Sequence, residues 1–401
     1  MNKLKVLAVN LGIIFASLFV GVAIAEVGVR IAGLEGLKKI SESTHAEYYP
    51  KFYIIPHPVR GWEHRANVSG WSINEEGKAY LEFNNYGLRG PKITKAKPEN
   101  TLRIAVLGDS FTSAVQVSYK QTFVGVMQKE LKKCTNFKGK KVQVINFGVN
   151  GYGTAQQLLT LREKVWDFQP DIVLLAFFNR NDVINNSRKL ENNHYRPFFV
   201  YKKGKLELDL SFRKLDTSHA NSYMITTVDK LPTWLVNNIR ILQLMKKVEA
   251  DQKKRYVGRH FKKLQANNFR EPPNSAWQEA WKITDELIGI IAKEVQEKGV
   301  EFKIATVMSH VQVHPDKEWR ERYTKTMDIQ DWSYPTRRLK KLGEIHNFSV
   351  IDLIEPFQNY IAENPVCVHG FKNTKMCSGH WNATGHKLAG EIIAENLCQG
   401  F

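Results

Sequence analysis

Two residues that lie far apart in the sequence have the chemistry of a nucleophile and its base. Ser110 ends the sequence Gly108-Asp109-Ser110, directly after the predicted strand 103–107, and His380 precedes the last stretch with helical periodicity. A serine hydroxyl attacks a carbonyl when a base within hydrogen-bond reach takes its proton, and neutral imidazole suits that task. Ser110 and His380 are therefore a candidate pair for acyl transfer. The simpler interpretation of Asp109 and Ser110 is that they cap a helix, where Asp and Ser are favoured.

Two further segments contain hydrogen-bond donors of the kind that stabilise an oxyanion. Residues 146–153 read Asn-Phe-Gly-Val-Asn-Gly-Tyr-Gly, and glycines let backbone amides approach a substrate closely. Asn181 follows another aliphatic run, and its side chain could donate to an oxyanion or only cap a turn. Both segments are candidates for the same site as Ser110.

The residues between these candidates predict the fold. From residue 101 onward, β-branched runs alternate with stretches of helical periodicity, which indicates a parallel sheet covered by helices on both faces. We expect strands at 103–107, 142–147, 171–178, 301–307 and 348–354, and helices near 121–133, 154–168, 276–298, 336–345 and 383–397. Five such strands give one doubly wound, flavodoxin-like α/β sheet. Ser110 then lies at its carboxyl edge, where such folds bind ligands.

Two regions break this pattern. Residues 31–100 mix aromatic, Pro and Gly positions without a period, so we expect an extended lead-in to a catalytic domain at 101–401. Residues from about 185 to 275 are predicted to be an insertion, with a hairpin near 198–210 and a basic helix near 233–255. The insertion has 19 Lys or Arg against 8 Asp or Glu, so its net charge of +11 is more than half of the chain's +18. Its basic face is either simply solvated or binds anionic lipid or acidic glycan.

The first 30 residues predict export. Lys3 and Lys5 precede an apolar run from Val6 to Ala25, which is long enough to span a bilayer with its N-terminus in the cytoplasm. The sequence at 23–25, Ala-Ile-Ala, also fits a signal peptidase site. We expect a membrane anchor or a cleaved signal peptide at 1–30, with the rest of the chain outside the cytoplasm. Export disfavours nucleic acid as a partner, despite the basic charge.

The four cysteines fit an oxidising compartment. Cys367 and Cys377 lie ten residues apart, where a disulfide could close a loop, whereas the pairing of Cys134 and Cys398 stays open. No cluster of Cys and His has the spacing of zinc ligands, so the sequence predicts no structural metal.

Taken in order, the blocks GDS, NFGVNGYG, NRND and GHWNATGH resemble those of the SGNH, or GDSL-type, hydrolase family over residues 102–398. The apolar N-terminus, with Glu26 and Arg30, is similar to that of membrane-anchored bacterial members. The resemblance implies a hydrolase without a metal or organic cofactor. It implies that Ser110 is the nucleophile and that His380 is the base. It also implies that the oxyanion donors are the Ser110 amide, Gly151 and Asn181.

The chain departs from the family at two places. The family has an acid two or three residues before the histidine, where this chain has Cys377 and Ser378, and Arg180 or Asn179 replaces a glycine before the block asparagine. The acid would fix the imidazole tautomer and stabilise imidazolium. Three alternatives remain: another carboxylate, such as Asp182 or one in the insertion, replaces it; a backbone carbonyl near Cys377 orients the ring; or catalysis is lost. The neighbours that could support the pair are Asp109, Asp182 and Ser378.

Together these inferences predict an exported serine esterase. The resemblance and the location suggest ester-linked acyl groups as substrates, in particular O-acetyl groups of envelope or exopolysaccharide glycans. One alternative is an O-acyltransferase with the same chemistry, and another is a catalytically silent glycan-binding protein that keeps the fold.

Overall fold

The computed structural model describes residues 2–33, 53–74, 77–137, 139–215, 227–372 and 376–400. Parts of the predicted lead-in (34–52 and 75–76) and of the predicted insertion (216–226) lie outside the described residues. The chain divides into two compact units, one of residues 1–50 and 218–260 and the other of residues 51–217 and 261–401. The candidate site lies in the second unit.

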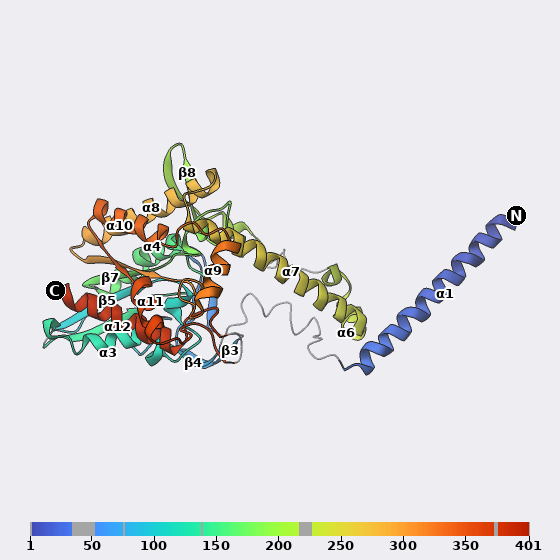
Figure 1. Cartoon of the computed structure of the whole chain (residues 1–401), viewed down its shortest axis with the longest axis horizontal. Coiled ribbons are helices and arrows are strands. Elements are labelled where there is room, and N and C mark those ends of the chain that lie inside the picture. The colour runs from blue at the N-terminus through green and yellow to red at the C-terminus, as the bar shows by residue number, and fades with distance from the viewer. Residues whose placement is uncertain are drawn as a thin grey trace. The chain divides into compact units, whose positions relative to one another are not determined.

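A five-stranded parallel sheet forms the centre of the second unit (Figure 1). Its strand order is β11-β10-β7-β5-β6, which is the flavodoxin-like order predicted from the sequence. The strands are β5 (Thr101–Leu107), β6 (Lys141–Asn146), β7 (Ile172–Phe178), β10 (Glu301–Val307) and β11 (Ser349–Asp352). Every residue of β5 is buried, as expected for a central strand covered on both faces.

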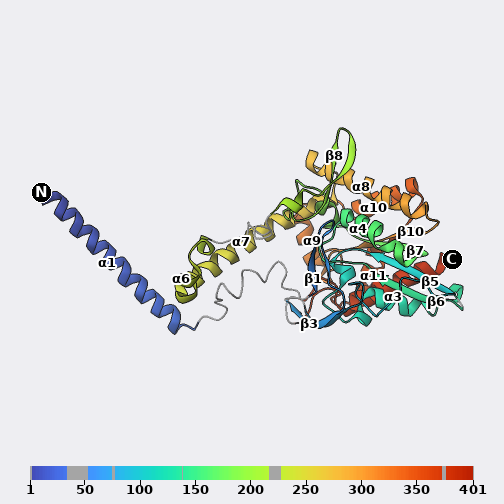
Figure 2. The same ribbon diagram turned by 180° about the vertical axis from the view of Figure 1, so that it is seen from behind.

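Helices cover both faces of this sheet and form two hydrophobic cores with it (Figures 1 and 2). One face packs against α4 (Thr154–Glu163), α8 (Ser275–Gln296) and α10 (Tyr334–His346). The other packs against α3 (Phe123–Leu131), α11 (Ile354–Glu363) and α12 (Ala383–Gln399). The predicted helix at 154–168 ends as a helix at Glu163 and continues as a 3-10 turn at Val165–Phe168.

Residues 53–100 contain four short strands where the sequence suggested only an extended lead-in. They form two antiparallel pairs, β1 (Ile54–His57) with β2 (Gly61–His64) and β3 (Val68–Asn74) with β4 (Gly77–Phe83). Beyond them, the buried Arg89 donates from Nη1 to Ser113 O at 2.5 Å and also binds the carbonyls of Ala114 and Val117. This segment therefore holds the turn that follows Ser110.

The insertion contains the predicted hairpin, β8 (Phe198–Lys202) and β9 (Lys205–Asp209). The predicted basic helix is two helices, α6 (Thr233–Asn238) and α7 (Arg240–Ala266), because Ile239 between them is extended. Helix α9 (Lys317–Thr326) was not predicted; it carries a charged, aromatic sequence without a buried face. Both disulfides form, Cys367–Cys377 as the sequence suggested and Cys134–Cys398, whose pairing the sequence left open.

In the first unit, helix α1 (Asn2–Ile31) is long and apolar enough, from Lys5 to Ile31, to cross a membrane, with a mean hydropathy of 2.4. Its apolar side chains are exposed, whereas Glu26 near its end is half-buried. The Glu26 carboxylate accepts the amides of Arg240 and Ile241, both at 2.9 Å, at the start of α7. Arg30 pairs with Glu26 at 2.8 Å and donates to Asn238 O at 2.8 Å.

His386 joins α12 to α3 in the core. Its side chain is 1% exposed, and its Nδ1 accepts the Phe123 amide at 3.3 Å. Burial lowers the pKa of His386 well below its usual value, and the positive charge of Arg89 acts in the same direction. The imidazole is therefore neutral in the folded protein, and the Nδ1 lone pair is available to accept.

We predict that His386 makes the fold sensitive to mild acid. In the unfolded chain this imidazole gains a proton near pH 6.5, whereas the folded chain does not, so stability falls as the pH drops below about that value. The slope is up to about 1.4 kcal/mol per pH unit for one proton. Thermal unfolding of the detergent-solubilised chain between about pH 8 and 5 should show a steeper loss for the wild type than for His386→Asn, which keeps an acceptor but does not titrate. Equal slopes would contradict this assignment.

Candidate active site

Ser110 is the first residue of a single helical turn, α2 (Ser110–Ser113), at the carboxyl end of β5. Asp109 is the N-cap, and its Oδ1 accepts the Phe111 amide at 2.9 Å, so the capping interpretation holds for Asp109. Gly108 has no space for a side chain, because a Cβ there would lie 2.1 Å from Thr112 Oγ1. The tight packing of Gly108 and the cap by Asp109 leave Ser110 half-buried at the sheet edge.

His380 lies within hydrogen-bond distance of Ser110, although 270 positions separate them in the sequence. The distance from His380 Nε2 to Ser110 Oγ is 2.8 Å. The Phe111 ring packs against the imidazole, with the ring centres 4.9 Å apart. Like Ser110, His380 is half-buried, so both side chains are partly accessible to solvent.

The loop that carries His380 is tied back on itself at several points. The Gly370 amide donates to His380 O at 3.0 Å, and the Cys377 amide donates to His369 O at 2.9 Å. His369 Nδ1 lies 2.8 Å from Gly379 O, and the Cys367–Cys377 disulfide closes the loop. Ser378 is half-buried in this loop. These contacts fix the backbone that presents the imidazole.

Gly151 lies in the loop between β6 and α4. Its φ of +77° is in the left-handed region, which glycine adopts without strain. The other two glycines of the block serve packing: a Cβ on Gly148 would lie 2.4 Å from Thr112 Cβ, and one on Gly153 would lie 2.6 Å from Asn185 Cβ. Among the three glycines, the backbone conformation therefore singles out Gly151, as the sequence resemblance does.

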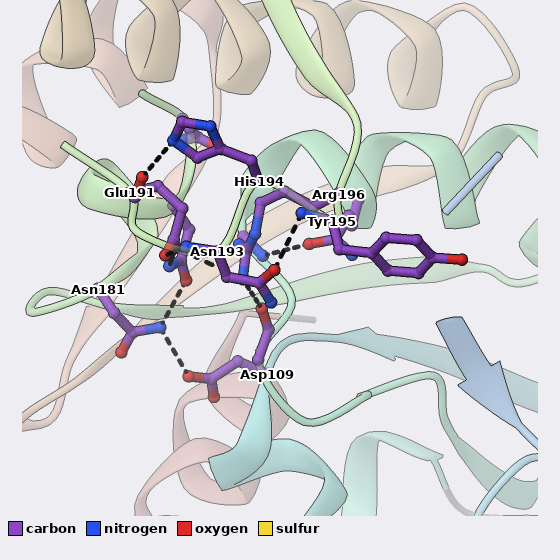
Figure 3. Close-up of polar contacts among 12 residues, drawn as sticks. Asp109, Asn181, Glu191, Asn193, His194, Tyr195 and Arg196 are labelled. Atoms are coloured by element: carbon purple, nitrogen blue, oxygen red, sulfur yellow. Dashed lines mark hydrogen bonds and ion pairs between the residues drawn. The ribbon is translucent and has the colours of Figure 1, made fainter. Parts of the chain in front are cut away.

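Asn181 follows β7 and directs its side-chain amide at two oxygens. Its Nδ2 lies 3.3 Å from Asp109 Oδ2 and 3.0 Å from Asn185 Oδ1 (Figure 3). The structure thus brings the third block next to the first, as predicted. Both amide hydrogens of Asn181 already have acceptors, so an incoming oxyanion would have to replace one of these two acceptors. The bond to Asp109 is the longer and therefore the weaker of the two.

Asp109 and Asp182 are two buried carboxyls in the same corner. Burial raises the pKa of Asp109, which the Phe111 amide and the nearby His380 ring oppose. Burial raises the pKa of Asp182 well above its usual value, and the neighbouring Asp109 adds to this. Asp182 Oδ2 accepts the Phe178 amide at 2.7 Å. This oxygen is thus directed at the chain end of β7, and the role of Asp182 as the acid partner of His380 stays a prediction.

Arg180 and Asn179, one of which replaces the glycine expected from the family, are both buried. The Arg180 guanidinium binds Gln265 Oε1, and its carbonyl accepts from Asn268 Nδ2 at 2.9 Å. Arg180 therefore packs against the end of α7 and the turn that follows. Within the described part of the chain, no group of three His, Cys, Asp or Glu residues could hold a metal ion.

Four residues that the sequence did not single out connect these groups: Trp62, Asn185, Glu191 and Arg196. Arg196 Nη2 donates to Gly151 O at 3.0 Å and lies 3.4 Å from Glu191 Oε2. Trp62 Nε1 donates to Asn150 O at 2.9 Å. No sequence motif marks these four residues, because their partners in the site come from other segments of the chain.

Three solved structures illustrate what this chain is similar to. An acetyl xylan esterase, AlAXEase, shares 13% identity at a TM-score of 0.36, over 74% of this chain and 100% of its own. A lipase/acylhydrolase from Enterococcus faecalis shares 14% identity at a TM-score of 0.38, over 75% of this chain and 97% of its own. A GDSL-like lipase from Bacteroides thetaiotaomicron shares 10% identity at a TM-score of 0.34, over 77% of this chain and 93% of its own. No family model and no curated protein matches the sequence.

The chain resembles GDSL-type hydrolases. The assignment of the fold rests on the strand order and parallel pairing described above. The blocks of the GDSL-type pattern meet at one edge of the sheet: Ser110 and His380 are in hydrogen-bond contact, and Asn181 contacts Asp109. Chemically, this arrangement pairs a hydroxyl with a base beside amide donors.

The raised pKa of Asp182 leads to a prediction about stability. The folded chain retains a proton that the unfolded chain releases near about pH 4, so Asp182 reduces stability as the pH rises above that value. Asp182→Asn removes this penalty and keeps the size of the side chain. The stability of Asp182→Asn relative to wild type should rise with pH between about 4 and 7, by up to about 1.4 kcal/mol per unit.

Thermal unfolding at several pH values would measure the difference. Asp167→Asn is the control, because Asp167 is half exposed in its ion pair with Lys95, and such pairs contribute little to stability. A relative stability of Asp182→Asn that falls with rising pH would contradict the assignment.

Proposed function

We propose that this chain is a serine esterase that removes ester-linked acyl groups, with Ser110 as the nucleophile and His380 as the general base. The observation that carries the proposal is the 2.8 Å hydrogen bond between Ser110 Oγ and His380 Nε2 at the carboxyl edge of a doubly wound sheet. A hydroxyl and an imidazole in this geometry are the minimum required for acyl transfer through a covalent intermediate.

In the proposed reaction, His380 Nε2 takes the Ser110 proton as Oγ attacks the ester carbonyl. The negative oxygen of the tetrahedral intermediate accepts from the Ser110 and Gly151 amides and the Asn181 side chain. The imidazolium returns the proton to the departing alcohol, and an acyl-enzyme remains on Ser110. Water, deprotonated by His380, then attacks the acyl carbon and restores the free hydroxyl.

In this proposal Asp109 supports the chemistry electrostatically. It precedes the nucleophile, is buried, and interacts favourably with a charged His380 ring. When His380 becomes imidazolium, the negative charge of the buried Asp109 stabilises it, because charges interact more strongly where water is excluded. We therefore assign to Asp109 the charge that stabilises the imidazolium. The positions where the family has its acid hold Cys377 and Ser378 in this chain.

The proposed substrates are O-acyl groups of envelope or exopolysaccharide glycans, in particular acetyl. The support is the proposed export of the chain and the partial exposure of all four site residues, which lets a substituent on a large molecule reach Ser110. The four are Ser110, Gly151, Asn181 and His380. The proposed reaction uses no metal or organic cofactor, because each proton is moved by His380.

Ser110→Ala and His380→Ala should each lower kcat/KM for p-nitrophenyl acetate by about three orders of magnitude or more. The double variant should be no worse than either single variant, because the two groups act as a unit. Ser113→Ala, in the same helical turn, is the control and should keep the activity. A fluorophosphonate should label the wild type on Ser110, and a folded wild type without this adduct would refute the proposal.

We also propose that α1 is retained as a membrane anchor. The potential cleavage site ends at Ala25, and the next residue, Glu26, accepts the first amides of α7. The helix is continuous from Asn2 to Ile31 across this site, whereas a signal peptidase needs an extended, accessible segment. Glu26 and Arg30 therefore connect the end of the anchor to α7 within the first unit.

Expression with a C-terminal tag in a bacterial host would test retention. The chain should stay in the membrane fraction after a carbonate wash, and mass spectrometry of the purified protein should detect peptides from residues 1–25. A mature chain that begins at Glu26 would show instead that the apolar segment is a cleaved signal peptide.

A further inference from the structure

A chain of hydrogen bonds starts at Asp109 and passes through Asn181 into the insertion (Figure 3). Asn181 donates to Asp109 and to Asn185, and Asn185 Nδ2 donates in turn to Glu191 Oε2. Glu191 then faces Arg196, with side-chain exposures of 9% and 5%. The ion pair is therefore buried at the end of a polar chain that begins beside the nucleophile.

The chemistry of Glu191 sets the orientation of every amide in this chain. An ionised carboxylate can only accept hydrogen bonds, so Asn185 must turn its Nδ2 toward Glu191. Its Oδ1 must then face Asn181, which in turn must present Nδ2 rather than Oδ1. The side of Asn181 that carries hydrogens thus points into the corner with Asp109. The Glu191 carboxylate sets this orientation through Asn185, and the Asp109 carboxyl, which accepts from the same Nδ2, favours it as well.

The loop around Glu191 holds this carboxylate in place. Glu191 Oε1 accepts the Asn193 amide at 2.7 Å, and Asn193 Oδ1 accepts the Tyr195 amide at 2.9 Å. The Glu191 amide donates to Ser187 O at 2.9 Å. Successive turns therefore order the segment between the two members of the ion pair, so that Arg196 returns to Glu191.

Arg196 extends the same constraint to the Gly151 loop. Its Nη2 donates to Gly151 O at 3.0 Å, and its guanidinium lies over the Trp62 ring, 5.4 Å from the centre. Trp62 Nε1 donates to Asn150 O at 2.9 Å. Because a trans peptide is planar, holding Asn150 O on the Trp62 side directs the Gly151 N–H to the opposite side.

We propose that the Glu191–Arg196 ion pair is a positioning element that orients both the Asn181 side-chain amide and the Gly151 N–H for the acyl oxygen. This inference rests on the proposed function, and it names residues that act through the donors without touching substrate. During attack, the Asn181 hydrogen that now contacts Asp109 at 3.3 Å would shift to the oxyanion, while the 3.0 Å bond to Asn185 keeps the amide in place.

Glu191→Gln tests the orientation at constant size. A glutamine amide can donate as well as accept, so Asn185 is free to flip and to turn its Nδ2 toward Asn181. Asn181 then either loses the bond that holds its amide in place or turns its own amide and gives up its bond to Asp109. Loss of one oxyanion donor costs about 10²–10³ in kcat, so we expect a fall of about tenfold to hundredfold with KM changed less than about threefold. Glu207→Gln, at an exposed position of β9, should leave kcat unchanged.

A reciprocal exchange separates orientation from general structure. Asn185→Asp alone places two carboxylates face to face and should lower kcat. In the double variant Glu191→Gln with Asn185→Asp, the new carboxylate again forces Asn181 to present Nδ2, and the glutamine introduced in place of Glu191 can donate to that carboxylate. We expect the double variant to recover at least about fivefold in kcat over Glu191→Gln, as part of the lost oxyanion donor returns. A double variant no better than the worse single variant, or an unchanged kcat in Glu191→Gln, would overturn the proposal.

Amide hydrogen exchange tests the Gly151 end independently of turnover. Arg196→Lys keeps the charge opposite Glu191 but lacks the planar fork that reaches both Glu191 and Gly151 O. Exchange in the peptide covering 148–153 should become about two- to tenfold faster, while the peptide covering β8 stays unchanged. Unchanged exchange at 148–153 would refute the positioning role. If the wild type neither hydrolyses esters nor reacts with fluorophosphonate, the proposed function fails while this measurement still decides the positioning claim.

Discussion

The hydrogen bond between Ser110 and His380 is the contact on which the candidate site depends, because it joins segments 270 residues apart. In the proposed reaction, it also sets where the substrate carbonyl lies. Parallel pairing of β5 with β6 and β7 brings the first three blocks to one edge of the sheet. The fourth block arrives there because α12 packs beside α3, and the Cys134–Cys398 disulfide joins the ends of that layer. The distance between Ser110 Oγ and His380 Nε2 thus depends on the packing of most of the second unit.

Both partners of that bond are held by backbone contacts. On the serine side, the Asp109 cap and the guanidinium of Arg89 fix the α2 turn. On the histidine side, the Cys367–Cys377 loop is tied through the Gly370 amide to His380 O. Rigid support at both ends lowers the entropy lost in forming a reactive geometry.

The sheet could be predicted because it follows from local patterns, whereas the Ser110–His380 pair could be predicted because four blocks stand in the order of the GDSL-type family. Buried parallel strands read as continuous aliphatic runs, and the carboxyl ends of such strands meet at one edge. The strands at 54–83 were missed, since they are short and lack a sustained alternation. Trp62, Glu191 and Arg196 were missed for a different reason: their partners, Asn150, Asn185 and Gly151, are set by tertiary contacts that no spacing reveals.

In the proposed mechanism, the two buried carboxyls of the site bear on how a transient imidazolium is stabilised. Burial raises the pKa of both Asp109 and Asp182, and the neighbouring Asp109 adds to the rise at Asp182. A proton on Asp182 would leave Asp109 as the carboxyl of the two that can carry the charge. A positive ring lowers the pKa of Asp109 further, so its ionisation is strengthened at the moment the ring is charged. In the proposed mechanism, a neutral Asp182 adds no second negative charge beside Asp109 and so favours the ionised form of Asp109.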